Sequence, residues 1–166
     1  DHTTTYEYDT AGNRIKQTTA SGAITAWIYD AKGNKLSETD PRGNTIVYTY
    51  DANGKLTTTV NAEGAITRTE YDKVGNKIAD INPLGYITWY YYDSANRLTT
   101  MEYPDGTTTK TVYDDEGNRI ASIDQDGTST SYEYNGSKQL VKTIYADQTT
   151  RQFGYDNAGR QTTVTD

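Results

Sequence analysis

Apolar and polar residues alternate in short segments of this chain, and the same segment returns at a fixed interval. The interval is 21 residues, and it is marked by a tyrosine at positions 8, 29, 50, 71, 92, 113, 134 and 155. The next residue is aspartate in seven of the eight copies, and Asn135 is the exception. In the segment that ends at Tyr50, the side chains of Ile46, Tyr48 and Tyr50 alternate onto one face, as they do in a β-strand. The pattern therefore predicts one strand ending at each repeat tyrosine.

A second short segment completes each unit. It opens with Ile or Leu in seven copies, whereas the eighth carries Gln161. The position two before the repeat tyrosine is aromatic in six copies, with Thr69 and Thr111 as the exceptions. No window shows the period of about 3.6 residues that marks an amphipathic helix. Two strands in each unit predict a chain of β-hairpins without helices.

Turn signals separate the strands at two points in each unit. One follows the repeat tyrosine, as in Asp51-Ala52-Asn53-Gly54, and the other comes half a period later, as in Asp40-Pro41-Arg42-Gly43. Asp accepts hydrogen bonds from backbone N–H groups, Pro pre-sets φ, and Gly adopts a positive φ. These residues predict type I turns followed by a left-handed residue and a bulge. The aspartate column then has a structural role, which we favour over a ligand role.

The distance from the repeat tyrosine to the following Ile or Leu is not constant. It is seven residues in four copies and six in three, although the total period stays at 21. A slip of one residue would move the Ile or Leu to the opposite face of the sheet. We therefore expect two turn lengths, with the extra residue absorbed in the turn or in a bulge so that the facing is kept.

The hairpins have to pack together, because an isolated hairpin is only marginally stable in water. We expect an all-β, solenoid-like fold, in which stacked hairpins form a single antiparallel sheet that is curved and twisted. The whole of 1–166 is expected to form one array of about eight units. Tyrosine hydroxyls need a partner or water when their rings pack. The aromatic layer is therefore expected near a wet surface and not in a sealed core.

Composition supports this picture and excludes several classes of protein. Leu, Ile, Val and Phe make up only 23 of the 166 residues, whereas Thr occurs 30 times and Tyr 16 times. Thr and Tyr are strong strand formers, so the packing has to be aromatic. The net charge of −7 does not suit nucleic acid binding. The sequence has no long apolar run and no signal peptide, and without cysteine it has no disulfide, thiolate zinc site or cysteine nucleophile.

The repeat resembles the YD repeat family, also called RHS repeats. The motif Tyr-Asp, Gly-Asn-Arg/Lys-Ile/Leu and Asp-Pro-x-Gly carries the resemblance, and the stretches 8–15 and 113–120 are close matches. In that family the hairpins form a long sheet that spirals into a hollow shell. Bacterial members are large secreted or surface toxins whose shell encloses a toxic domain, and animal teneurins use a similar shell in cell adhesion.

Eight units are fewer than the family uses to close a shell, so the resemblance implies an open fragment of a longer polypeptide. No segment matches the self-cleaving core that follows the repeats in toxin members. The partners that the resemblance implies are neighbouring repeats and an enclosed toxin domain, in a secreted or cell-surface setting. We also expect the edge strands to self-associate when the fragment is isolated.

The residues offer little material for a reactive site, and we assign no catalytic, cofactor-binding or metal-binding residue. The loop 124–127 resembles part of a calcium loop but lacks the remaining ligands, so a turn is the favoured interpretation. His2 is the only histidine and is interpreted as a terminal residue. The sequon Asn135-Gly136-Ser137 fits a surface turn.

Two classes of function stay open. The first is a structural shell segment, without enzymatic activity, that encloses or displays another part of its polypeptide. The second is an adhesion or carbohydrate-binding module, in which Tyr86, Trp89 and Tyr91 stack on sugar rings. Tyr91 alternates opposite to its two tyrosine neighbours, so one of the two faces is expected to meet solvent.

Overall fold

The computed structural model describes residues 3–166, which form strands joined by tight turns. This range contains sixteen strands and no helix, so the all-β prediction is confirmed. The chain divides into two compact units, the first ending at Ile87 and the second running from Thr88 to Asp166. In each unit, neighbours in the sheet are neighbours in the chain. The fold is therefore a succession of antiparallel hairpins, as the repeat predicts.

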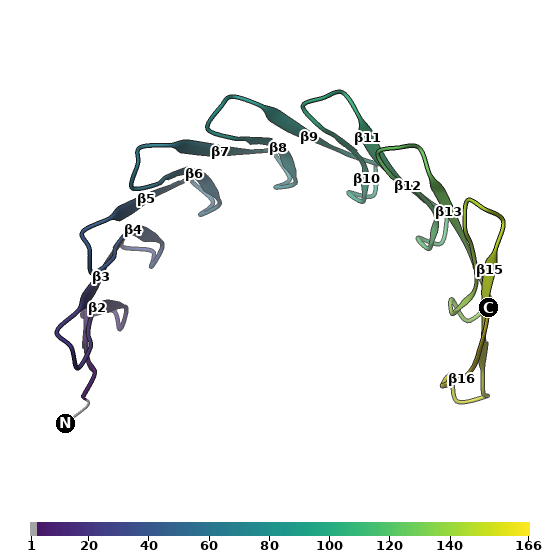
Figure 1. Ribbon diagram of the computed structural model, residues 1–166, viewed down its shortest axis with the longest axis horizontal. Helices are drawn as coiled ribbons and strands as arrows, with labels where there is room; N and C mark the ends of the chain where they lie inside the picture. Colours follow the sequence, from purple (N-terminus) through teal and green to yellow (C-terminus); the bar gives the residue numbers. More distant parts are fainter. Residues whose placement is uncertain (1–2) are drawn as a thin grey trace. The chain divides into compact units, whose positions relative to one another are not determined.

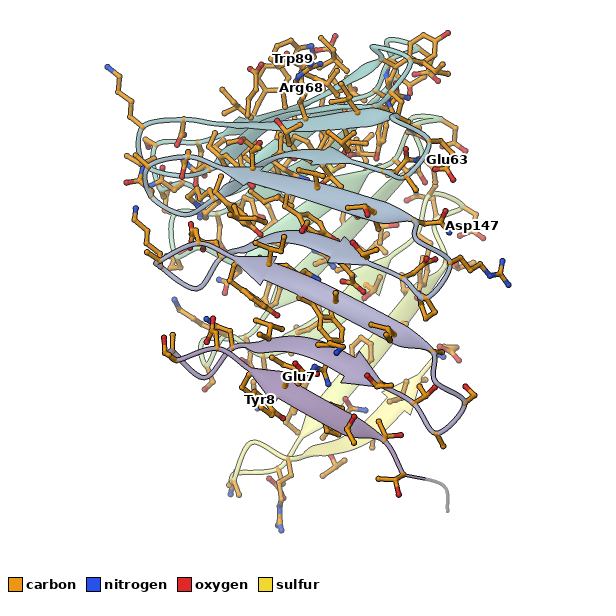
Figure 2. The ribbon with its side chains drawn as sticks, turned by 90° about the vertical axis from the view of Figure 1, so that its left-hand side faces the viewer. Glu7, Tyr8, Glu63, Arg68, Trp89 and Asp147 are labelled. Carbon is orange, nitrogen blue, oxygen red and sulfur yellow. The ribbon has the colours of Figure 1, made fainter. Side chains whose placement is uncertain are left out.

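The first unit bends steadily from β2 to β8 (Figure 1). Figure 2 looks onto its strands. Tyr8 lies on the side of the turns that follow the repeat tyrosines, and Glu63 lies on the opposite side, in one of the turns half a period later. All seven strand pairs of this unit are antiparallel. The strands are β1 (Thr5–Tyr8), β2 (Arg14–Thr18), β3 (Ile24–Tyr29), β4 (Lys35–Thr39), β5 (Thr45–Tyr50), β6 (Leu56–Val60), β7 (Ile66–Tyr71) and β8 (Lys77–Ile81).

The second unit repeats this arrangement, and its strands alternate between six and five residues. Its seven strand pairs are also antiparallel. Its strands are β9 (Ile87–Tyr92), β10 (Leu98–Glu102), β11 (Thr108–Tyr113), β12 (Arg119–Ile123), β13 (Ser129–Tyr134), β14 (Leu140–Ile144), β15 (Thr150–Tyr155) and β16 (Gln161–Thr165).

The turn after each repeat tyrosine is closed by backbone and side-chain hydrogen bonds together. In the first copy the Gly12 N–H donates to the Asp9 carbonyl at 3.1 Å, and Gly12 has a φ of +88°. The Asp9 carboxylate accepts the N–H groups of Ala11 and Asn13 at 3.0 and 2.8 Å, and the Asn13 side-chain amide at 2.9 Å. We call this arrangement the Asp–Asn clasp. The predicted turn, with a left-handed glycine in its fourth position, is confirmed.

The prediction of two turn lengths is wrong. The Asp30 N–H donates to the Asn34 carbonyl, and the Asp51 N–H donates to the Lys55 carbonyl, both at 2.9 Å and both four residues on. The closing bond spans the same number of residues in all eight copies. The sequence difference therefore lies beyond the turn, in the strand that follows it.

A β-bulge at the start of each second strand absorbs the difference. Tyr29 lies opposite Lys35 and Ile28 opposite Ser37, which leaves Leu36 as the extra residue of the bulge. In the next copy Tyr50 lies opposite Leu56, and the extra residue is Thr57. A bulge sets two residues against one on the partner strand. The conserved Ile or Leu occupies the second bulge position in one class of copy and the first in the other.

The two faces of the sheet differ in exposure. The face that carries the repeat tyrosines, here called the tyrosine face, is half-buried, as at Tyr48 and Tyr50 of β5. The opposite face, here called the second face, is more open and carries Val47 and Thr49 on the same strand. Among residues 3–166 only Ala79 and Thr143 are buried, and no large side chain is fully buried. The structure therefore bears out an aromatic layer near water in place of a sealed core.

The left-handed turn position gives a direct test of the backbone geometry. Gln148 has a φ of +69° where most copies carry glycine. A side chain in this region costs about 1–2 kcal/mol, because Cβ crowds the following carbonyl oxygen. We expect Gln148→Gly to raise the free energy of unfolding by about 1 kcal/mol, measured by urea denaturation. The matched control Gly85→Ala, at a φ of +83°, should lower it by a similar amount. A stabilising alanine at position 85 would contradict this account.

Candidate functional site

In five copies the repeat tyrosine ties its hairpin to the one before it. The Tyr50 hydroxyl donates to the Lys35 carbonyl at 2.8 Å, across 15 residues of sequence. Four further copies make the same bond at 2.9–3.3 Å, from Tyr71 to Leu56, Tyr113 to Leu98, Tyr134 to Arg119 and Tyr155 to Leu140. The acceptor is the carbonyl of the residue opposite the preceding repeat tyrosine, at the bulge. The tyrosine hydroxyl thus finds its expected partner in the backbone of the neighbouring hairpin.

Basic residues on the tyrosine face stack over the aromatic rings of the next hairpin. In copies where the Ile or Leu occupies the second position of the bulge, the basic residue occupies the first position. Its side chain then covers the aromatic ring of the residue two positions before the next repeat tyrosine. Arg14 lies 4.4 Å from the Trp27 ring and Arg119 lies 4.4 Å from the Tyr132 ring. Cation–π contacts of this kind stabilise by about 0.5–1 kcal/mol at exposed sites.

In the other class of copy the basic residue lies one position earlier and reaches the repeat tyrosine itself. Lys55 is 4.9 Å from the Tyr71 ring, and Arg97 is 4.5 Å from the Tyr113 ring. Lys55 Nζ also donates to the Gly75 carbonyl at 2.8 Å, which joins two successive turns. These basic residues had no predicted role. Their spacing to the aromatics of the next unit, which is constant within each class of copy, was the signal for it.

The aromatic candidates Trp89 and Tyr91 lie on the second face of β9, and Tyr86 lies in the turn that precedes this strand in the sequence. Trp89 and Tyr91 are 37% and 46% exposed, and Tyr86 in the turn is 55% exposed. Tyr90 and Tyr92 are half-buried, so the face of Tyr91 meets solvent, as expected. The Trp89 ring stands clear of its strand in Figure 2.

A carboxylate accompanies these rings. Glu102 on β10 lies directly opposite Trp89, and its carboxylate accepts the Tyr91 hydroxyl at 2.9 Å. This hydrogen bond raises the pKa of Tyr91. Two exposed aromatic side chains and one oriented carboxylate thus lie together on β9 and β10. Both aromatics were predicted as candidates and Glu102 was missed, because the strand register that pairs it with Trp89 was not known.

The loop 124–127 forms the expected turn. The Gly127 N–H donates to the Asp124 carbonyl at 3.0 Å, and the Asp126 carboxylate accepts the Thr128 N–H at 2.8 Å. The hydroxyl of Thr128 lowers the pKa of Asp126 to about 2, with a further contribution from Asp124. Residues 3–166 hold no group of three or more His, Cys, Asp and Glu residues suited to a metal ion.

The sequon lies on an exposed turn, as expected. Asn135 accepts the N–H groups of Ser137 and Gln139 at 3.0 Å each, and its amide donates to Gln139 Oε1 at 2.9 Å. His2, interpreted from the sequence as a terminal residue, lies outside the described residues. The described part of the chain has no helix with the length and apolar character needed to cross a bilayer.

Comparison with known families identifies the repeat. The family model for the RHS repeat matches residues 8–45, 29–69, 50–85, 71–108 and 113–150. The chain belongs to the RHS repeat family. The resemblance noted in the sequence is thereby confirmed. A search of curated proteins found no match.

Solved structures of toxin complexes share the fold of this RHS repeat chain. The crystal structure of TcdB2-TccC3-Cdc42 matches with a TM-score of 0.75 and 19% identity over 98% of this chain. The crystal structure of TcdB2-TccC3-TEV matches with a TM-score of 0.76 and 20% identity over 97% of it. The Tc holotoxin pore of Photorhabdus luminescens, carrying the TccC3 mutation D651A, matches with a TM-score of 0.73 and 18% identity over 99%. In all three the RHS repeat chain spans 11% of the matched chain.

We expect removal of one repeat hydroxyl to weaken the tie between hairpins. Tyr50→Phe leaves the ring in place and deletes the bond to the Lys35 carbonyl, so it should lower the free energy of unfolding by about 1 kcal/mol. Urea denaturation measures the change. The control Tyr8→Phe, at a ring that is 59% exposed, should stay within about 0.5 kcal/mol of the parent. Equal losses in the two variants would contradict an inter-hairpin role for the hydroxyl.

The Asp–Asn clasps predict a loss of stability in acid. The side-chain amides of Asn13, Asn34 and Asn44 lower the pKa of Asp9, Asp30 and Asp40, respectively. A folded pKa below the unfolded value of about 3.9 stabilises the fold at higher pH, and this stability disappears as the pH falls through the folded pKa. Urea denaturation at a series of pH values should show the free energy of unfolding falling below about pH 4.

A matched variant separates this effect from general acid denaturation. Asn13→Ala removes the side-chain amide that donates to the Asp9 carboxylate, so the part of the acid loss that comes from Asp9 should shrink. An unchanged pH profile in this variant would show that the clasp does not set the pKa of Asp9.

Proposed function

We propose that this RHS repeat chain is a non-catalytic segment of a β-shell wall. The observation that carries the proposal is the tie between consecutive hairpins, in which tyrosine hydroxyls and basic side chains of one repeat bind the next. The described residues place no large side chain in a sealed core. Such an arrangement extends a thin sheet, which suits a wall better than a reaction centre.

The wall is proposed to enclose or display another domain of a longer polypeptide in a secreted or cell-surface setting. Membership in the RHS repeat family and the likeness to chains of toxin complexes support this role. The matched chains are far longer than this sequence, which spans 11% of them. Residues 1–166 are accordingly proposed to act as one array of about eight units within such a polypeptide, with neighbouring repeats and an enclosed toxin domain as partners.

Limited proteolysis of the full-length polypeptide that carries this segment tests enclosure. If the repeats form a closed wall, the non-repeat domain should resist protease in the intact protein. The paired variant Tyr50→Ala and Tyr71→Ala removes two ties and should open the wall, so the same domain should be cleaved faster. Equal cleavage of that domain in the parent and in a preparation without the repeats would exclude enclosure.

A second candidate function is carbohydrate binding on the second face of β9 and β10. Trp89 and Tyr91 offer exposed rings, and the Glu102 carboxylate beside them accepts hydrogen bonds from hydroxyl groups. Aromatic surfaces with a few oriented polar groups are typical of ligand sites. The alternative is that these rings only cover the sheet, and the shell role needs no ligand there.

Titration with neutral oligosaccharides, followed by tryptophan fluorescence, distinguishes the two functions. A binding module should give a saturable shift that Trp89→Ala abolishes, whereas Trp27→Phe, at a ring on the tyrosine face, should leave the shift in place. Glu102→Gln should weaken binding without changing the fold, which circular dichroism checks. No fluorescence change over the titration would exclude carbohydrate binding by this surface and favour the shell.

A further inference from the structure

Asn135 combines two features that no other turn of the chain combines. It stands where the other seven repeats carry aspartate, and the next residue is Gly136. A glycine has no Cβ, so its own backbone nitrogen is open to approach. The space beside the Gly136 Cα atom is open, with no neighbouring atom within 4 Å of where a Cβ would lie.

The turn holds the Asn135 side chain as an activated electrophile. Asn135 Oδ1 accepts backbone N–H bonds from Ser137 and Gln139 at 3.0 Å each. The bond to Ser137 closes a ring that contains both the Asn135 Cγ atom and the Gly136 nitrogen. Two donors on one carbonyl oxygen polarise the carbonyl and stabilise the negative charge that develops there on attack.

The Gly136 N–H takes no part in closing the turn. The closing bonds run from the Asn135 N–H to the Gln139 carbonyl and from the Lys138 N–H to the Asn135 carbonyl, at 3.0 and 2.9 Å. The nucleophile, the electrophile and the oxyanion donors therefore belong to one short loop. Pre-arranged reacting groups lower the entropic part of the barrier.

We propose that Asn135 is a site of spontaneous deamidation promoted by its own turn. The Gly136 nitrogen loses its proton to solvent and forms a bond to Asn135 Cγ. The Cγ–Nδ2 bond then breaks, and Nδ2 leaves as ammonia after taking a proton from water. Water opens the resulting cyclic imide at either carbonyl, which yields aspartate or isoaspartate. The sum is one water consumed and one ammonia released, without oxidation or reduction.

The modification changes a contact between hairpins. Gln139 Oε1 now accepts the Asn135 amide at 2.9 Å, while Gln139 Nε2 donates to the Gly159 carbonyl at 3.1 Å. A carboxylate at position 135 accepts hydrogen bonds but cannot donate one when ionised. Gln139 then has to turn its amide toward position 135, which releases the Gly159 carbonyl. Deamidation thus replaces the hydrogen bond between Gln139 and the Gly159 carbonyl of the next repeat with a hydrogen bond between Gln139 and residue 135 of the same turn.

The chain contains its own controls. Asn61 caps a turn in the same way, with its side-chain oxygen accepting the Glu63 and Ala65 N–H groups, but the next residue is Ala62. Asn82 is followed by Pro83, which has no N–H to lose. Asn53 does precede a glycine, yet the Gly54 N–H is engaged with the Asp51 carbonyl at 3.0 Å.

Peptide mapping by mass spectrometry after incubation at mildly alkaline pH in ¹⁸O-water tests the proposal. Trypsin places Asn135 in the peptide 120–138 and Asn53 in the peptide 43–55, and fragment ions locate the heavy label. In the folded protein we expect labelling at Asn135 to exceed that at Asn53 several-fold. In urea the two Asn-Gly sites should react at similar rates, because the turns are lost.

Variants test the role of the turn. Gly136→Ala fits the site and should slow labelling at position 135 several-fold, since Cβ obstructs the nitrogen. Asn135→Asp has no side-chain amide at this position, so it should show no labelling that arises from the loss of ammonia. Folded-state labelling at Asn135 that is no faster than at Asn53, or slower than in urea, would overturn the proposal. Because the folded and unfolded parent protein are compared directly, the proposal stays falsifiable even if Gly136→Ala fails to fold.

Discussion

The hydrogen bond from the repeat tyrosine to the backbone of the preceding hairpin, made in five copies, is the interaction on which the structure depends. A single sheet of hairpins has no second layer to bury its side chains, so its stability has to come from neighbours along the array. The ring packs on the tyrosine face, and the hydroxyl of Tyr50 reaches the Lys35 carbonyl beside the bulge. The ring of one side chain therefore packs on the sheet, and its hydroxyl binds the preceding hairpin.

The β-bulge explains how the sequence varies without disturbing this arrangement. Because two bulge residues face one partner, the apolar residue stands at Leu36 in one copy and Leu56 in the next, while the turn stays the same length. The basic residue moves with it, and its contact shifts from the ring two before the next repeat tyrosine to that tyrosine itself. The two classes of copy therefore share one backbone conformation and differ in which bulge position carries the apolar residue.

Strand positions, hairpin order, left-handed glycines and solvent-facing Tyr91 could all be predicted, because they follow from alternation and turn chemistry within a few residues. The turn length could not, since the extra residue after Gly33 fits equally well as part of the turn or of the strand. The roles of Arg14 and Lys55 and the pairing of Glu102 with Trp89 were also missed. Each of these contacts depends on the register between neighbouring strands, and the spacing of residues along the sequence does not determine that register.

The constant register of the tyrosine bond has a consequence for how such chains change in length. Donor and acceptor lie 15 residues apart in each of the five copies that make the bond, and the turns close identically. Insertion or loss of any whole number of repeats, at any breakpoint, keeps this separation of 15 residues between the hydroxyl and its acceptor carbonyl. Gene duplication and unequal recombination can thus lengthen or shorten the array without requiring a single compensating substitution.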